Sequence, residues 1–178
     1  MEVTNVMDHV THAVVSAGQS RSFQVSDNAE FFHIISDALY SDKPLAVVRE
    51  ILCNAWDAHI ENGLTEVAVE VNIDDDYMTF TDFGVGIADN MIQEIYGTFG
   101  NSTKQHDGNQ TGGFGLGSKA PFCWAEHFEV TSNHMGVKTI YSMAKSSAMV
   151  GGKPSITPLV SIPTDDTGIS VKVETKGA

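Results

Sequence analysis

Apolar residues recur at helical spacing in two neighbouring segments of the N-terminal half. Asn28–Tyr40 (NAEFFHIISDALY) lines up phenylalanine, isoleucine and leucine side chains along one helical face. The turn SDKP leads into a second predicted helix over Pro44–Glu61, where proline occupies an acceptable first-turn position. An Asn-Gly pair follows it and is typical of a helix end. Two consecutive helices are therefore expected before the first regular strands.

An alternation of apolar and polar residues then predicts strands. Glu66–Ile73 (EVAVEVNI) alternates as a half-buried strand does, and an aspartate turn joins it to a second strand over Tyr77–Asp82. The same pattern predicts strands over His127–Ser132, Gly136–Ala144, Ser155–Ile162 and Gly168–Glu174, and short helices are expected over Asp89–Tyr96 and Ser118–Glu126. These elements predict an α+β fold, a two-layer α/β sandwich with a mixed, mostly antiparallel sheet covered by helices.

Two segments do not fit regular elements. Val14–Val25 is polar with a β tendency, typical of an edge strand or an arm. Gly97–Gly117 is a long stretch rich in Gly, Asn, Thr and Gln. Loops of this length inside a compact domain are uncommon unless they are functional. The 178 residues predict one domain, with residues 1–25 as an arm and residues 101–112 as a mobile cover.

The charge balance excludes some partners. Ten basic residues among 23 acidic ones give a formal net charge of -13, which disfavours wrapping nucleic acid or lying on anionic lipid. ATP remains compatible, because Mg²⁺, backbone N–H groups and one or two lysines can neutralise phosphate locally. A transmembrane segment or secretory signal is not expected, and Cys53 and Cys123 suit a reducing cytosol as small buried residues. The sequence therefore predicts a cytoplasmic location.

The predicted second helix carries candidate chemistry in REILCNAWDAH. Glu50, Asn54 and Asp57 fall at i, i+4 and i+7 and share one face of that helix. A carboxylate can take a proton from attacking water, and an amide oxygen is a hard ligand for Mg²⁺. The same spacing also occurs on the solvated polar stripe of an amphipathic helix.

A glycine turn follows the second predicted strand. In DFGVGI, the residues Gly84 and Gly86 permit a tight turn and a close approach to a flat ligand, with Ile87 beside them. Asp82 at the strand end can accept a hydrogen bond from an exocyclic amine such as that of adenine. An ordinary turn capped by aspartate is the alternative. A protein kinase is excluded, because the remaining kinase motifs are missing.

Two polar segments are suited to phosphate. Successive small residues in TGGFGLGSKAPF open a predicted helix and expose N–H groups to an anion. The candidate contacts there are Gly112, Gly113, Phe114, Gly115, Leu116, Gly117 and Lys119. Upstream, GTFGNSTK supplies the short donors Asn101, Ser102 and Thr103 and the cation of Lys104. The spacing is not that of a P-loop, and a flexible linker is the alternative.

The order of these segments resembles the GHKL (Bergerat-fold) ATPase superfamily of gyrase B, MutL, histidine kinases and the large heat-shock chaperone. The resemblance implies that Glu50 is the base, that Asn54 ligates Mg²⁺ and that Asp82 holds the adenine amino group. It also implies that Gly113–Gly117 cradle the triphosphate and that Thr167 helps to hold adenine, although Asp166 stands where the family usually has glycine. The expected cofactors are ATP and Mg²⁺, and a lid over Asn101–Gly112 would close on them.

More narrowly, LYSDKPLAVVREILCNAWDAH and GGFGLGSKAPF look like the N-terminal region of bacteriophage RIIA rapid-lysis proteins. This resemblance covers about Phe31 to Val173 and implies a longer protein that acts in lysis inhibition in the host cytoplasm. In the superfamily a lysine from a following domain often reaches the γ-phosphate, so slow hydrolysis is expected of these residues alone. Two functions stay open: an ATPase, or an ATP-gated module that forms a homodimer through its arm or binds a host or phage protein.

Overall fold

The computed structural model describes residues 21–22, 41–98, 117–147 and 153–176. Within these residues a seven-stranded sheet has the order β1-β6-β5-β4-β7-β3-β2, and every pair of neighbouring strands is antiparallel. The strands are β1 (Arg21–Ser22), β2 (Glu70–Ile73), β3 (Tyr77–Thr81), β4 (His127–His134), β5 (Val137–Ser147), β6 (Lys153–Pro163) and β7 (Gly168–Glu174). The helices are α2 (Lys43–Glu61), α3 (Asp89–Gly97) and the 3₁₀ helix η1 (Gly117–Cys123).

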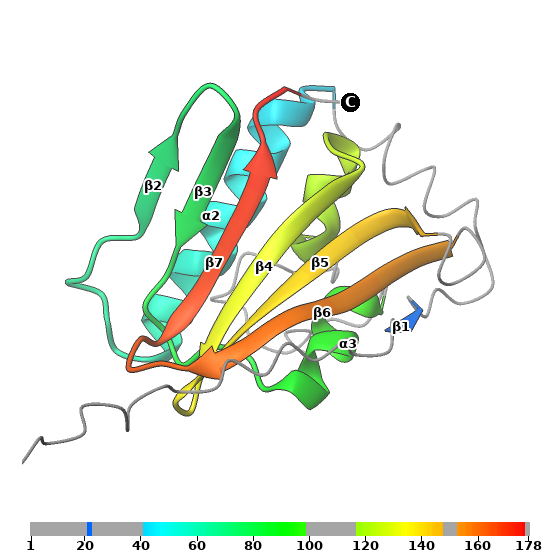
Figure 1. Cartoon of the computed structure of the whole chain (residues 1–178). Coiled ribbons are helices and arrows are strands. Elements are labelled where there is room, and N and C mark those ends of the chain that lie inside the picture. Colours follow the sequence, from blue (N-terminus) through cyan, green and yellow to red (C-terminus); the bar gives the residue numbers. More distant parts are fainter. Residues whose placement is uncertain (1–20, 23–40, 99–116, 148–152, 177–178) are drawn as a thin grey trace, which may run out of the picture.

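The described helices α2, α3 and η1 lie on one face of the sheet (Figure 1). Alternate strand residues point toward them, as the two-residue period of a strand requires. Phe80, Phe128, Val130, Met143 and Val173 are buried on this face together with Val47 and Ile51 of α2. The α+β two-layer fold predicted from the sequence is confirmed.

The long helix α2 begins where its sequence provides a cap. The carboxylate of Asp42 accepts a hydrogen bond from Leu45 N at 3.1 Å, and Pro44 occupies the first turn. At the other end the N–H of Asn62 returns to the carbonyl of Ala58. The predicted helix over Pro44–Glu61 therefore differs from the observed one by a single residue.

Two elements are shorter or tighter than predicted. The strand expected over Glu66–Ile73 begins only at Glu70, because a turn in which Val67 N donates to Leu64 O occupies its first part. The helix expected over Ser118–Glu126 is the 3₁₀ helix η1, since Pro121 inside it lacks an N–H to donate. The helix predicted over Asn28–Tyr40 and the predicted lid lie outside the described residues.

Candidate functional site

Helix α2 brings its polar face against the start of η1. A Cβ at position 117 would lie 2.8 Å from Oε2 of Glu50 and 3.6 Å from Oδ1 of Asn54. Only glycine fits there without displacing the carboxylate, so the end of the glycine-rich segment meets the predicted base and the predicted magnesium ligand. The structure thus brings together residues from two motifs that are far apart in the sequence.

Glu50 is held by its neighbour on the helix. Nη2 of Arg49 donates to Oε1 of Glu50 at 2.6 Å, and the Glu50 side chain retains 20% of its exposure. Its second oxygen faces Gly117. Asp57, two turns further along α2, is buried. The predicted polar stripe is therefore partly exposed near Glu50 and fully buried at Asp57.

Asp82 follows β3 and is nearly buried, with 5% of its surface exposed. Its Oδ1 accepts hydrogen bonds from Gly84 N at 2.9 Å and from Ile169 N at 3.2 Å. Burial raises the pKa of this carboxyl, and the two backbone donors oppose that rise because they favour the charged form. Within the described residues no hydrogen bond reaches Oδ2, so this oxygen can accept a ligand amine.

The chain around Asp82 is packed against the start of β7. Gly168 has a φ of +97°, and a Cβ there would lie 2.0 Å from the carbonyl oxygen of Asp82. Beside it, the exposed Thr167 donates its hydroxyl to the carbonyl of Phe83 at 3.3 Å. Thr167 and Asp82, both predicted adenine contacts, therefore lie at the same corner of the sheet.

The second half of DFGVGI is fixed to β4. Gly86 has a φ of +71°, and a Cβ there would collide with the carbonyl of Asn133 at 2.2 Å. Ile87 exchanges two hydrogen bonds of 2.8 Å with the hydroxyl of Ser132. Gly84 lies instead beside Asp82, Ala58 of α2 and Asn62, which caps the end of that helix.

Lys119 is buried where η1 meets α3. It is 1% exposed, and its ammonium donates to the carbonyl of Ile95 at 2.7 Å, where Ser118 also donates at 2.9 Å. This carbonyl belongs to the last turn of α3, where a cation and a hydroxyl satisfy an unpaired acceptor. Burial lowers the pKa of Lys119 to about 8. In this arrangement Lys119 joins η1 to α3, and its contact with phosphate stays a prediction.

The remaining predicted phosphate contacts lie outside the described residues. They are Asn101, Ser102, Thr103, Lys104, Gly112, Gly113, Phe114, Gly115 and Leu116.

One buried residue at this site was not predicted. His59 of α2 has no exposed surface. It hydrogen-bonds to Val67, which precedes β2 in the sequence, and to Phe83, which follows β3. The signal in the sequence was periodic, because residue 59 continues the buried row of Val47, Ile51 and Ala55 at four-residue spacing. A histidine in an apolar row needs hydrogen-bond partners inside the protein.

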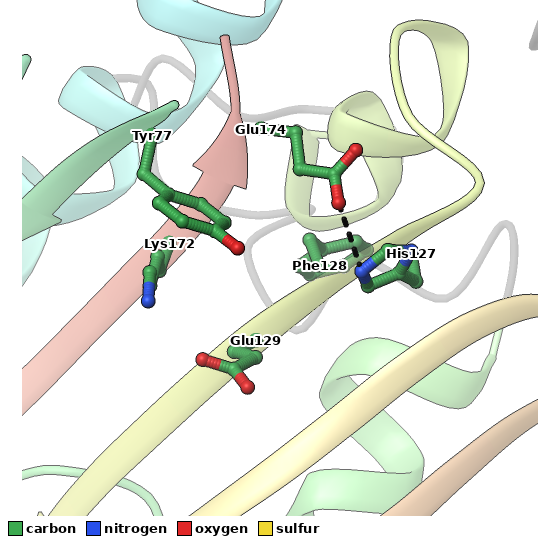
Figure 2. Close-up of a pocket in the computed structure, with 6 residues that line it drawn as sticks. All are labelled: Tyr77, His127, Phe128, Glu129, Lys172 and Glu174. Carbon is green, nitrogen blue, oxygen red and sulfur yellow. Dashed lines mark ion pairs between the residues drawn. The ribbon is translucent and has the colours of Figure 1, made fainter. Parts of the chain in front are cut away.

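A separate hollow lies on the face of the sheet opposite the described helices (Figure 2). Tyr77, Glu129, Lys172 and Glu174 line it, Lys172 Nζ lies 3.9 Å from the Tyr77 ring centroid, and His127 pairs with Glu174 at 3.2 Å. Its volume of about 50 Å³ is far below that of a nucleotide pocket. We place the candidate site on the helix-covered side, where Gly117 meets Glu50 and Asn54 and where Asp82 is buried after β3.

The donors present fit magnesium and a purine nucleotide. Glu50 and Asn54 offer hard oxygens at one point of α2, which is the chemistry that Mg²⁺ selects. The absence of a Cβ at Gly117 leaves backbone exposed beside them, and Asp82 offers a buried acceptor. No group of three or more His, Cys, Asp or Glu that could hold a metal occurs within the described residues.

The fold has one layer of helices and one sheet, with these polar groups on the covered face of the sheet. This arrangement is compatible with a nucleotide-binding domain of the α+β class. Residues 42–167 match the family described as histidine kinase-, DNA gyrase B-, and HSP90-like ATPase. The chain belongs to this family, which supports the predicted GHKL superfamily and ATP binding in general.

Individual relatives are chaperones. The chain is 28% identical over 183 residues to the chaperone protein HtpG of Vesicomyosocius okutanii, covering 89% of this chain and 29% of that protein. It is 27% identical over 143 residues to HtpG of Alkalilimnicola ehrlichii and 26% identical over 133 residues to HtpG of Psychrobacter cryohalolentis. These matches cover 66% and 61% of this chain, and 22% and 20% of those proteins. The chain thus spans less than a third of the length of these relatives.

Among the described helices, none is both long and apolar enough to cross a membrane.

Proposed function

We propose that this domain binds Mg·ATP between α2 and the sheet and hydrolyses it slowly. The observation that carries the proposal is the contact of Gly117 with Glu50 and Asn54. It joins the end of the glycine-rich segment to a carboxylate and a carboxamide on one helix. Family membership supports the nucleotide, and the geometry supports the division of roles between residues.

The adenine end of the ligand is assigned to the corner formed by Asp82 and Thr167. Oδ2 of Asp82 accepts from the exocyclic amine, while Oδ1 stays bound to Gly84 N and Ile169 N. Thr167 contributes its hydroxyl from the neighbouring turn. A buried acceptor of this kind rejects a ligand that brings no donor, because the unpaired group then keeps its full desolvation cost.

The phosphate end is assigned to the region of Glu50, Asn54 and Gly117. Asn54 offers its amide oxygen to Mg²⁺, which would neutralise charge on the phosphates when bound. Backbone N–H groups of Gly113–Gly117 stabilise phosphate oxygens, and Asn101–Lys104 lie in the proposed lid. Glu50 orients water and accepts its proton through the oxygen not held by Arg49. Turnover by this domain is proposed to be slow.

A second candidate is an ATP-gated interaction module with little turnover. The observation in its favour is that β1 pairs with β6 at the edge of the sheet, Arg21 opposite Ile156. An edge strand at the end of an N-terminal segment can be exchanged between two copies. Size-exclusion chromatography with and without a non-hydrolysable ATP analogue separates the two functions. A nucleotide-dependent dimer without turnover favours the module, and a monomer that hydrolyses ATP favours the enzyme.

The narrower assignment to RIIA-like phage proteins rests on the segments LYSDKPLAVVREILCNAWDAH and GGFGLGSKAPF. Under this proposal the domain works in the host cytoplasm on a host or phage protein partner during lysis inhibition. Direct contact with nucleic acid is not proposed, because of the net charge of -13.

A thermal-shift titration with Mg·ATP tests the main proposal. Saturation at a hundred times the dissociation constant stabilises a folded domain by about 2.7 kcal/mol, so the wild type should melt at a higher temperature. Asp82→Asn should need at least about tenfold more ATP for the same shift, which is about 1.4 kcal/mol. Omitting Mg²⁺ should weaken the wild-type response. A melting temperature that does not respond to Mg·ATP would refute ATP binding.

A further inference from the structure

His59 connects the helix that carries Glu50 and Asn54 to the loop that carries Asp82. Its ring lies wholly inside the protein, with Nδ1 3.0 Å from the carbonyl oxygen of Val67 and Nε2 2.9 Å from the amide nitrogen of Phe83. The ring centroids of His59 and Phe83 are 6.1 Å apart. No other side chain within the described residues hydrogen-bonds to the Phe83 N–H.

The two partners determine the tautomer of this histidine. A carbonyl oxygen can only accept, so Nδ1 must carry the proton that goes to Val67. A backbone N–H can only donate, so Nε2 must be the unprotonated nitrogen that accepts from Phe83. His59 is therefore a neutral imidazole with both nitrogens satisfied, as a buried polar group requires.

The backbone of Phe83 is held through both its N–H and its carbonyl. Its N–H is held by His59 from α2, and its carbonyl accepts from Thr167 next to β7. The following N–H, of Gly84, returns to Oδ1 of Asp82. The direction of the Asp82 carboxylate therefore depends on the position of the Gly84 N–H. His59 helps to fix that position because it holds the N–H of the preceding residue, Phe83.

We propose that His59 is a positioning residue for adenine recognition, acting through the Phe83 N–H on the Asp82 carboxylate. An apolar residue would fill the same space in the buried row of α2, but it would leave the Phe83 N–H unpaired. The peptide group between Asp82 and Phe83 could then rotate and move the Asp82 carboxylate away from the adenine amine. The inference rests on the proposed ATP function and adds to it a residue that reads the purine indirectly.

Two substitutions separate the two nitrogens of the ring. His59→Gln places an amide oxygen near the position of Nε2 and keeps an acceptor for Phe83. His59→Asn places an amide nitrogen near the position of Nδ1 and keeps only the donor to Val67. Both variants remove the ring and lose one hydrogen bond, so each serves as the stability control for the other.

The measurements are the affinities for Mg·ATP and Mg·GTP by calorimetry, beside the melting temperature of each unliganded variant. We expect His59→Asn to weaken ATP binding at least about tenfold and to lower the ratio of ATP to GTP affinity. His59→Gln should stay within about threefold of the wild type, although both variants lose similar stability. Equal losses of affinity in the two variants, or an unchanged ATP to GTP ratio in both, would overturn the proposal.

A measurement on the wild-type protein keeps the test independent of how the variants fold. An N–H···N hydrogen bond produces a nitrogen–nitrogen coupling in NMR spectra, here between Phe83 N and His59 Nε2. We expect this coupling without nucleotide, and a shift of the Phe83 amide when Mg·ATP is added. A protonated Nε2, or a Phe83 amide that is unmoved by bound nucleotide, contradicts the positioning role. Failure of the wild type to bind any nucleotide would instead contradict the proposed function and leave the coupling intact.

Discussion

Gly117 lies against the carboxylate of Glu50, at a distance that leaves no room for a side chain. A Cβ at position 117 would lie 2.8 Å from Oε2 of Glu50, and the amide of Asn54 is the next nearest group. The first residue of η1 therefore constrains the residue proposed to act on water. Because the neighbour is the end of a flexible side chain and not backbone, an added methyl group would displace Glu50 without breaking the fold.

This contact predicts that Gly117→Ala uncouples binding from turnover. The displaced carboxylate would no longer point at the water beside the phosphate, and misplacement of about 1 Å can cost about a hundredfold in rate. We expect kcat to fall at least about tenfold, while the melting temperature changes by only a few degrees. Steady-state ATPase assays and thermal melts measure the two effects. An unchanged kcat would show that Glu50 adjusts without consequence.

Glu50→Gln tests the proposed role directly. Glutamine keeps the size of the side chain and can still accept from Arg49, but it cannot take a proton from water. General-base catalysis contributes about 10²- to 10⁴-fold, so turnover should fall by at least about a hundredfold while ATP affinity stays within about threefold. Glu61→Gln, an exposed change on the same helix, is the matched control and should leave both values unaltered. Hydrolysis at the wild-type rate in Glu50→Gln would remove the base assignment.

The strands and the two-layer fold were predictable because their signal is local. In β7 the alternation of Val171 and Val173 with polar neighbours gives the strand and its buried face, and the bounds of Gly168–Glu174 are the predicted ones. Glu50 and Asn54 follow from helical spacing in the same way. Their contact with Gly117 did not follow from any local pattern, and only a family resemblance suggested it.

The contacts of Lys119 and His59 depend on tertiary structure and were therefore not predicted. A lysine after a glycine run is expected to meet phosphate, yet the neighbour of Lys119 is the carbonyl of Ile95 at the end of α3. His59 lies in an apolar row whose partners, Val67 and Phe83, come from two other segments. Sequence spacing gives the face on which such a residue lies, but not the backbone group that it meets.

Burial of Lys119 predicts that the folded state becomes more stable as the pH rises through the alkaline range. Its pKa is lowered from 10.5 to about 8, so between these values the unfolded chain binds a proton that the folded chain has released. The stability of the folded state must therefore rise as the pH increases from about 8 to 10.5, by at most roughly 3 kcal/mol. Below pH 8 both states are protonated, and the folded state bears the full cost of a buried charge.

Lys119→Met removes the titrating group and provides the comparison. Urea unfolding of the wild type and of this variant at pH 7.5, 9 and 10 (chosen to span about two units of the window) should show wild-type stability rising relative to the variant. Parallel stabilities at all three values would contradict the assignment. Lys176→Met, a change at a lysine whose side chain is 80% exposed, should leave the pH dependence as it is in the wild type.

Asp82 should reduce the stability of the domain in the absence of nucleotide. Burial is the largest influence on this carboxyl and raises its pKa, which means that folding favours the protonated form. That contribution is fully present below the ordinary value of 3.8 and is lost as the pH rises through the raised pKa, so at pH 7.5 the folded state holds a poorly solvated charge. Asp82→Asn retains an acceptor for the N–H groups of Gly84 and Ile169 and removes the charge.

We therefore expect unliganded Asp82→Asn to melt at a higher temperature than the wild type at pH 7.5, by about 2–4 °C for each kcal/mol gained at this chain length. The difference should shrink as the pH falls through the raised pKa and below the ordinary value of 3.8, where the wild-type carboxyl is protonated in both states. Asp75→Asn, at an exposed position of the β2–β3 turn, controls for the change in net charge. A variant that is stabilised yet binds ATP more weakly would show that the carboxylate is kept for recognition at a cost to folding, as active-site charges often are. A variant less stable than the wild type at pH 7.5 would instead indicate that Asp82 mainly holds the backbone of its turn.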